Sequence, residues 1–170
     1  MGSMSIATLK GLSHLELLHL YDALLCELRA RGITRSANNP VADYSEWLAS
    51  RALGLKLEAK STTGYDGTCL KGLKYEVKGR RRTPQNGSYQ LSQIRGLDKR
   101  HFDYLVGIIY RQDFSVDYAA QIPYDVVAER ARYVGHTNAS ILQFRPDVLE
   151  DPRVTDITSL ICAASQFSVP

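Results

Sequence analysis

Three side chains have the types and spacing to hold a divalent cation and act on a phosphate: Asp66, Glu76 and Lys78. Side chains two residues apart on a strand project from the same face, so Glu76 and Lys78 are expected side by side. Asp66 precedes Glu76 by ten residues, and a turn between them would bring the two carboxylates together. Such a pair suits Mg²⁺ or Mn²⁺, because both ions prefer oxygen ligands. With a lysine to orient water and stabilise a pentavalent phosphate, the set predicts phosphodiester hydrolysis.

An acid two residues before a lysine is a common pattern, and it occurs a second time at Glu58 and Lys60. We prefer the pair Glu76 and Lys78 because it lies in a strand-like alternation and is followed directly by a run of arginines. Asp66 also lies upstream of it, across a turn. Glu58 and Lys60 precede a Ser-Thr-Thr-Gly loop, and we interpret them as a solvated strand end.

The elements that must position these side chains can be read from the hydrophobic period and the turn residues. Residues 62–70 and 73–81 are predicted to be two strands joined by a tight turn at Lys71 and Gly72. Further strands are expected at residues 56–59, 102–110, 115–122 and 140–144. Helices are expected at residues 13–31, 39–53, 89–97, 123–132 and 157–164. The first of these begins with a capping box, Ser13 with Glu16, and has an apolar side of leucines.

This order of elements predicts an α/β domain with a mixed central β-sheet flanked by helices. A single domain is expected over residues 1–170. Its expected parts are a cloning remnant at 1–3, an N-terminal helical region at 5–32, a catalytic core at 39–123 and a C-terminal extension of helix and strand at 124–170.

The composition is that of an ordinary globular protein, with 44% hydrophobic and 23% charged residues. No apolar run is long enough to cross a bilayer, so a membrane partner is not expected. Its three cysteines form neither a disulfide framework nor a zinc pattern, which predicts a cytoplasmic location. Phosphate-cradling glycine loops and Ser-His-Asp patterns do not occur, which argues against nucleotide-driven motors and serine hydrolases.

Basic residues gather around the motif although the net charge is only +3. Between Lys71 and Arg100 there are nine lysines and arginines against two acids. A cluster of this kind is typical of a surface that binds nucleic acid, and an ordinary solvated face is the alternative. Phosphates that reach the predicted metal site would pass near Arg80, Arg81 and Arg82, so we expect these arginines to bind the polymer backbone.

Asp66, a short hairpin and then Glu76-Val77-Lys78 resemble the PD-(D/E)XK motif of the restriction-endonuclease-like nucleases. Tyr65 stands where that motif often has its proline, and the resemblance covers residues 39–122. It implies a restriction-endonuclease-like core and a Mg²⁺-dependent DNA endonuclease, with Mn²⁺ as a substitute metal. Many members of the superfamily have a further metal-binding acid on the helix before the first core strand.

Glu46 matches that helix position by order and spacing, which gives a metal set of Asp66, Glu76 and Glu46 beside Lys78. Asp43 lies one turn earlier on the same side and is its competitor. The resemblance also implies a helix that contacts the substrate backbone, with the polar residues Gln90, Gln93 and Arg95. Base reading would have to come from elsewhere, with Tyr89 and the polar residues 135–138 as candidates.

Cutting both strands of DNA with one active site per chain usually needs two chains, so a homodimer is expected, or else a partner subunit that supplies specificity. Other functions remain open on the same residues. One is a nucleic-acid-binding module that does not cleave, and another is a nuclease for RNA or DNA junctions. A third is a subunit of a larger assembly without its own activity.

Overall fold

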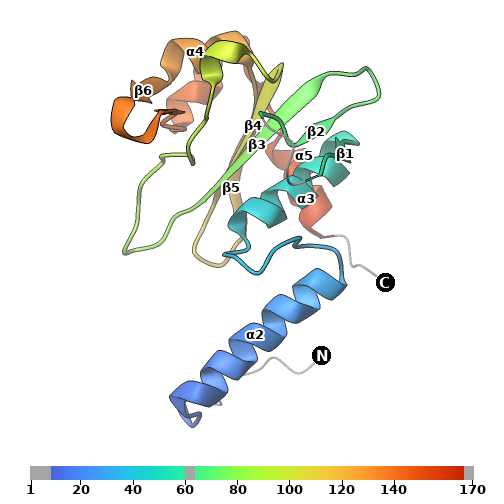
Figure 1. Ribbon diagram of the computed structural model, residues 1–170, viewed down its shortest axis with the longest axis vertical. Helices are drawn as coiled ribbons and strands as arrows, with labels where there is room; N and C mark the ends of the chain where they lie inside the picture. Colours follow the sequence, from blue (N-terminus) through green and yellow to red (C-terminus); the bar gives the residue numbers. More distant parts are fainter. Residues whose placement is uncertain (1–8, 60–63, 167–170) are drawn as a thin grey trace.

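The computed structural model describes residues 9–59 and 64–166 and is built around a mixed six-stranded sheet (Figure 1). The strands follow the order β1-β2-β3-β4-β5-β8; β3 and β4 are parallel, and all other neighbours are antiparallel. Their bounds are β1 Lys56–Leu57, β2 Gly67–Thr68, β3 Lys74–Arg81, β4 Tyr104–Tyr110, β5 Val116–Pro123 and β8 Thr155–Asp156. The predicted α/β class with a mixed sheet is therefore confirmed.

Helices cover both faces of this sheet. The α-helices are α2 His14–Ala30, α3 Val41–Leu53, α4 Tyr124–Arg130 and α5 Thr158–Ser165. The short 3-10 helices are η1 Leu97–Lys99, η2 Gly135–Thr137 and η3 Pro146–Glu150, and a separate hairpin is formed by β6 Arg132–Val134 and β7 Ala139–Ile141. None of the helices in the described ranges is both long and apolar enough to span a membrane.

Alternation along β3 divides its side chains between two cores. Tyr75 and Val77 pack with α3 and α5 on one face of the sheet. Neighbouring β4 is buried on both faces. Val106 and Ile108 join the same core, while Leu105 and Ile109 join a second core with α4 and with Leu142, which follows β7. An apolar strand buried on both sides is the reason that residues 102–110 could be predicted as central.

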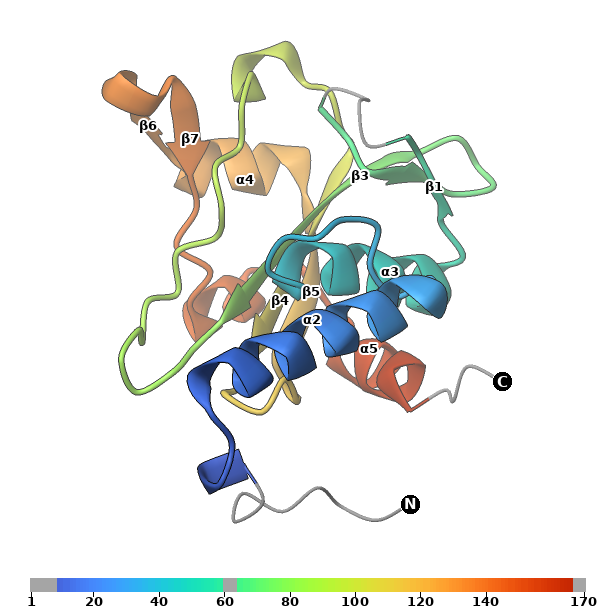
Figure 2. The same cartoon turned by 60° about the horizontal axis from the view of Figure 1, so that its bottom comes forward.

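The N-terminal helix begins as predicted, because the Ser13 hydroxyl accepts from the Glu16 amide and the Glu16 carboxylate accepts from the Ser13 amide. Its apolar side is less buried than expected, since Leu25 is the one residue of α2 classed as buried. Exposed apolar side chains on α2 are Leu15, Leu17, Leu18, Tyr21 and Leu24. Both views place α3 between α2 and the sheet, so α2 lies outside the layered core (Figure 1, Figure 2).

The helix expected over residues 89–97 is wrong. Leu91 and Ile94 are spaced like one face of a helix and both are buried, but residues 89–94 are extended, and Arg95 and Gly96 form a turn that leads into η1. The Leu91 amide donates to Leu142, and Ile94 exchanges two backbone hydrogen bonds with Ser140 of β7. Partners from a distant segment thus satisfy the backbone groups that a helix would have satisfied internally.

The predicted hairpin is present, but its first strand is short. A turn after Cys69 with Gly72 at φ 78° connects β2 and β3. The strand expected over residues 62–70 is reduced to the two residues of β2, while positions 62 and 63 lie outside the described residues. Strands β6 and β8, with three and two residues, were not predicted.

Candidate active site

The short β2 strand leaves one edge of β3 open, and Asp66 occupies that edge. Since β2 pairs only with Lys74 and Tyr75, the next amide of β3 on this side, Val77, has no strand partner. The Asp66 amide donates to the Tyr75 carbonyl at 2.8 Å, and Asp66 Oδ2 accepts from the Val77 amide at 2.7 Å. The carboxylate thus replaces a missing backbone carbonyl and is fixed at the open edge.

Glu76 and Lys78 lie side by side on β3, as their spacing predicted. Lys78 Nζ lies 2.5 Å from Glu76 Oε1, and both side chains are largely buried. They project from the face opposite Tyr75 and Val77, which pack in the core with α3. The geometric prediction for this pair is confirmed, whereas its catalytic role stays a prediction.

Helix α3 brings Glu46 to the same place because Gly79 allows a close approach. A Cβ on Gly79 would lie 2.0 Å from Ser45 Oγ, so any larger residue would push α3 away from β3. Glu46 and Asp66 both line two cavities of about 250 and 240 Å³. The first of these is also lined by Lys78 and by Ser92 of the extended segment, a residue that the sequence did not single out.

Arg35 is a second functional candidate that sequence reasoning missed. Its Nη2 pairs with Glu46 Oε2, and its Nη1 donates to the Glu58 carbonyl at 2.7 Å. Asp43, only 5% exposed, accepts from the amides of Arg35 and Ser36 and from the Ser36 hydroxyl. Asp43 therefore supports the loop that carries Arg35, which favours Glu46 over Asp43 as the helix acid of the site.

The electrostatics of the carboxylates is unfavourable for negative charge. Burial raises the pKa of Asp66 to about 6 and the nearby Glu76 carboxylate adds to this, although Lys78 and the Val77 amide act in the opposite direction. Burial also raises the pKa of Glu46, with Arg35 opposing it. Burial lowers the pKa of Lys78, but the carboxylates of Glu76 and Asp66 outweigh it, and the net shift is upward. A further cation would relieve this repulsion.

The donor chemistry of these carboxylates fits Mg²⁺, but they are not arranged as a complete ligand set. Within residues 9–59 and 64–166, no three histidine, cysteine, aspartate or glutamate side chains are placed to hold a metal ion. Lys78 contacts Glu76 and Arg35 contacts Glu46, so these two cations neutralise the acids. Holding Mg²⁺ would require Asp66 with Glu76 or Glu46, after Arg35 or Lys78 moves, with water and phosphate oxygens completing the shell.

The arginines after Lys78 are engaged within the chain. Arg80 donates to the Ser88 carbonyl and to Asn86 Oδ1, Arg81 donates to the Gln112 carbonyl, and Arg82 donates to the Gly87 carbonyl. The guanidinium of Arg82 also lies over the ring of Tyr89. These arginines hold the loops beyond β3, and their binding of nucleic acid stays a prediction.

The other sequence candidates are placed differently from expectation. Residues 89–94 are extended and Arg95 lies in the turn before η1, so Gln90, Gln93 and Arg95 do not share a helix face. Gln90 is half-buried, and the other two are exposed. Glu58 is not simply a solvated strand end, since it is half-buried and lines a cavity with Asp66. Position 60, the lysine of that second pattern, lies outside the described residues.

A comparison with protein-family models found no match to this chain, and a search of curated proteins also found none. The site therefore has to be interpreted from its own residues and geometry.

Proposed function

We propose that this protein is a Mg²⁺-dependent endonuclease of the restriction-endonuclease-like type that hydrolyses phosphodiester bonds of DNA. The observation that carries the proposal is the position of Asp66, whose half-buried carboxylate is fixed at the open edge of β3 with a raised pKa. Glu76 and Lys78 lie on β3 itself, and Glu46 lines the same two cavities as Asp66. Buried acids kept close together against their own repulsion are typical of catalytic sites.

Each residue then has a defined role. Asp66, Glu76 and Glu46 would hold Mg²⁺, or Mn²⁺ in its place, and the bound metal would supply Lewis-acid activation of the phosphate and of water. Lys78 orients the attacking water and neutralises charge on the pentavalent phosphate. Arg35 is paired with Glu46, and its guanidinium would be free to contact a phosphate oxygen if a divalent cation took its place at that carboxylate.

The arrangement of elements also supports a restriction-endonuclease-like core. Helix α3 precedes the hairpin of β2 and β3. Asp66 directly precedes the short strand β2, and Glu76 and Lys78 lie within the long strand β3. A parallel strand, β4, then lies beside β3 and supports the pair from the other edge.

Plasmid cleavage with millimolar Mg²⁺ tests the proposal directly. Lys78→Met and Glu76→Gln should each reduce the rate by at least about 100-fold, because they remove groups that act on the transition state. Lys56→Met is the matched control, since Lys56 is an exposed lysine of the same sheet. Equal cleavage by all of these proteins would remove Glu76 and Lys78 from the mechanism.

We further propose that two copies act together, since cutting both strands requires two active sites. The exposed leucines of α2 offer an apolar surface for such a homodimer or for a partner subunit. Light scattering would show a dimer, and a monomeric mass during double-strand cutting would contradict it.

A nucleic-acid-binding module without catalysis is the second candidate. It is favoured by one observation: Arg35 and Lys78 already neutralise Glu46 and Glu76. This alternative predicts salt-sensitive DNA binding and no cleavage with any metal. A panel of duplex DNA, RNA and branched DNA separates both candidates from an RNA- or junction-specific nuclease.

A further inference from the structure

A cavity of about 890 Å³, several times larger than those at the active site, lies between η1, α4 and the β6–β7 hairpin. Its wall includes residues 95–99 at the end of the extended segment and residues 137–140 of the hairpin. We call it the hairpin cavity. None of the three acids assigned to the metal site lines it.

The cations of the hairpin cavity are not engaged within the protein. The side chains of Arg95 and Lys99 make no ion pair or hydrogen bond with any residue in the described ranges, and His101 adds a third nitrogen-bearing side chain. Asp98 also lines the cavity and offsets part of this charge. Arg80 and Arg82, by contrast, are bonded to loop carbonyls. Cations without intramolecular partners beside a cavity favour an anionic ligand.

Aromatic and hydroxyl groups complete the wall. Tyr133 is 63% exposed, and its hydroxyl donates to Asn138 Oδ1 at 3.0 Å, which fixes the ring at the rim. The Tyr124 hydroxyl donates to the Leu97 carbonyl at 2.6 Å and ties α4 to η1. Ser140 of β7 is only 7% exposed and lines the inner part of the cavity wall.

Two links connect the hairpin cavity with the active site. Ser92 lines an active-site cavity and Arg95 lines the hairpin cavity, and an extended chain covers three residues in about 10 Å. On the other side, His101 packs so closely on Gly64, two residues before Asp66, that a Cβ there would lie 2.4 Å from the His101 Cβ. The hairpin cavity and the active-site cavity are thus connected through the segment that holds Ser92 and Arg95 and through the contact between His101 and Gly64.

We propose that the hairpin cavity binds a nucleotide unit, with the phosphate at Arg95 and Lys99 and the base against Tyr133. The inference rests on the proposed function in one respect: the nucleotide belongs to the strand that is held at Asp66. A base turned out of the duplex into a pocket is stacked on aromatic rings and hydrogen-bonded at its edge, which Tyr133, Asn138 and Ser140 can provide. A free nucleotide has the same chemistry and is the other source of the ligand.

Fluorescence anisotropy in EDTA tests the proposal without any need for cleavage. The probes are a labelled thymidine oligonucleotide of about five residues, matching a short single-strand site, and unlabelled dTMP as a competitor. Arg95→Gln and Tyr133→Leu should each weaken oligonucleotide binding by about tenfold, the loss expected for a phosphate contact or a stacked base. Arg132→Gln is the control, because this exposed arginine lies on the same hairpin but does not line the cavity.

Each outcome has a definite reading. Losses confined to the two cavity variants support the proposal, and competition by dTMP would identify a free nucleotide as a sufficient ligand. Equal binding by all variants, or no binding of either probe, overturns it. Plasmid cleavage by the same proteins separates the two ideas: cleavage without cavity binding leaves the proposed function intact, and cavity binding without cleavage leaves only this inference.

Discussion

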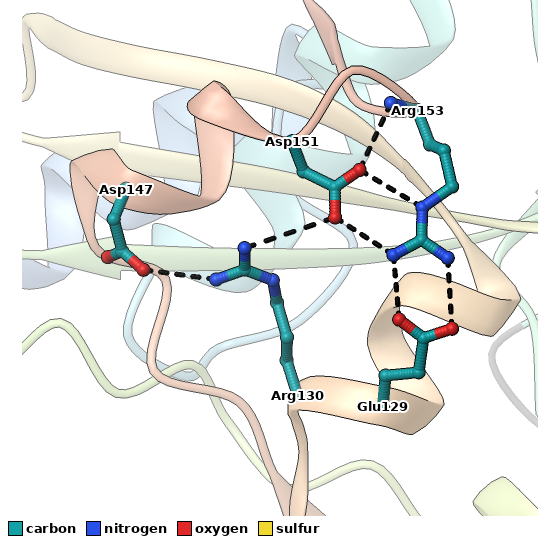
Figure 3. Close-up of polar contacts among 5 residues, drawn as sticks. All are labelled: Glu129, Arg130, Asp147, Asp151 and Arg153. Carbon is teal, nitrogen blue, oxygen red and sulfur yellow. Dashed lines mark hydrogen bonds and ion pairs between the residues drawn. The ribbon is translucent and has the colours of Figure 1, made fainter.

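Two groups of acids and cations in this molecule use the same residue types and have opposite electrostatics. In the first, which we call the α4–η3 network, Arg153 donates to both oxygens of Glu129, at 2.9 and 2.6 Å, and to Asp151 (Figure 3). Arg130 links the same network to Asp147 at 3.0 Å. Hydrogen bonds from Arg153 lower the pKa of Asp151 to about 2 and also lower the pKa of Glu129.

At the active site the pKa values of the acids are shifted upward instead. Burial raises the pKa of Asp66 to about 6, and the pKa of Glu46 is raised as well. In the α4–η3 network, each acid is paired with an arginine that contacts solvent. At the active site, the acids lie together away from solvent, and the neighbouring cations only partly compensate their charge. The α4–η3 network thus behaves as a structural ion network, in which the charged form of each acid is favoured. At the active site the charged form is disfavoured, as is typical of acids that bind a ligand.

Asp66→Asn should give the largest effect and separate activity from stability. Cleavage should fall at least about 100-fold because a metal ligand is lost. The free energy of unfolding near neutral pH should rise by about 2–3 kcal/mol, since a buried charge is removed while the amide oxygen still accepts from Val77. Urea unfolding measures this change in the free energy of unfolding. Asp151→Asn, which removes a favourable charge, should lower stability instead, and a loss of stability in both variants would contradict the comparison.

The pH dependence of stability should show the two regions in separate windows. The folded protein binds the Asp66 proton more tightly than the unfolded chain, so this contribution is present below about pH 4 and is lost as pH rises through 6, at a cost of about 2–3 kcal/mol. Asp151 acts oppositely: its contribution is lost as pH falls from about 4 through 2. Chemical unfolding at a series of pH values measures both, and Asp66→Asn should abolish only the upper transition. An unchanged upper transition in that variant would assign it to another group.

Arg35→Gln should have an intermediate effect, on metal binding rather than folding. Removing the cation that pairs with Glu46 leaves the acids less neutralised, so the affinity for Mn²⁺ should rise by about threefold to tenfold, on the order of one ion pair. Isothermal titration measures the affinity. Arg29→Gln on exposed α2 is the control, and a weaker affinity in Arg35→Gln would mean that Arg35 supports the metal site instead of competing with the metal.

Arg153→Gln should have the smallest effect on function. The Arg153–Glu129 pair is about half exposed, and the α4–η3 network shares no residue with the active site. Cleavage should therefore stay within about twofold of the wild-type rate while the melting temperature falls slightly. A thermal scan beside the plasmid assay checks this. A large loss of activity would show that the network and the active site are coupled.

The sequence predicted those parts of the molecule that local patterns determine. The capping box of α2, the buried strand β4 and the side-by-side position of Glu76 and Lys78 all follow from period and residue type. The edge position of Asp66 could be anticipated only roughly, because it depends on where β2 stops pairing with β3.

Features that depend on distant partners could not be predicted. Residues 89–97 have helical spacing of apolar side chains, but β7 satisfies their backbone and keeps residues 89–94 extended. Arg35 belongs to no motif and reaches Glu46 only because Asp43 holds its loop. The bond from Arg35 to the Glu58 carbonyl likewise joins segments that are distant in the sequence.

The most direct test of the central claim is an anomalous diffraction map from crystals grown with Mn²⁺. The account predicts a peak at the open edge of β3, with the carboxylates of Asp66 and of Glu76 or Glu46 about 2–2.5 Å from the ion and Lys78 beside it. If protein that cleaves DNA gives crystals with no Mn²⁺ peak at these carboxylates, or with the ion bound elsewhere, the proposed metal site is wrong.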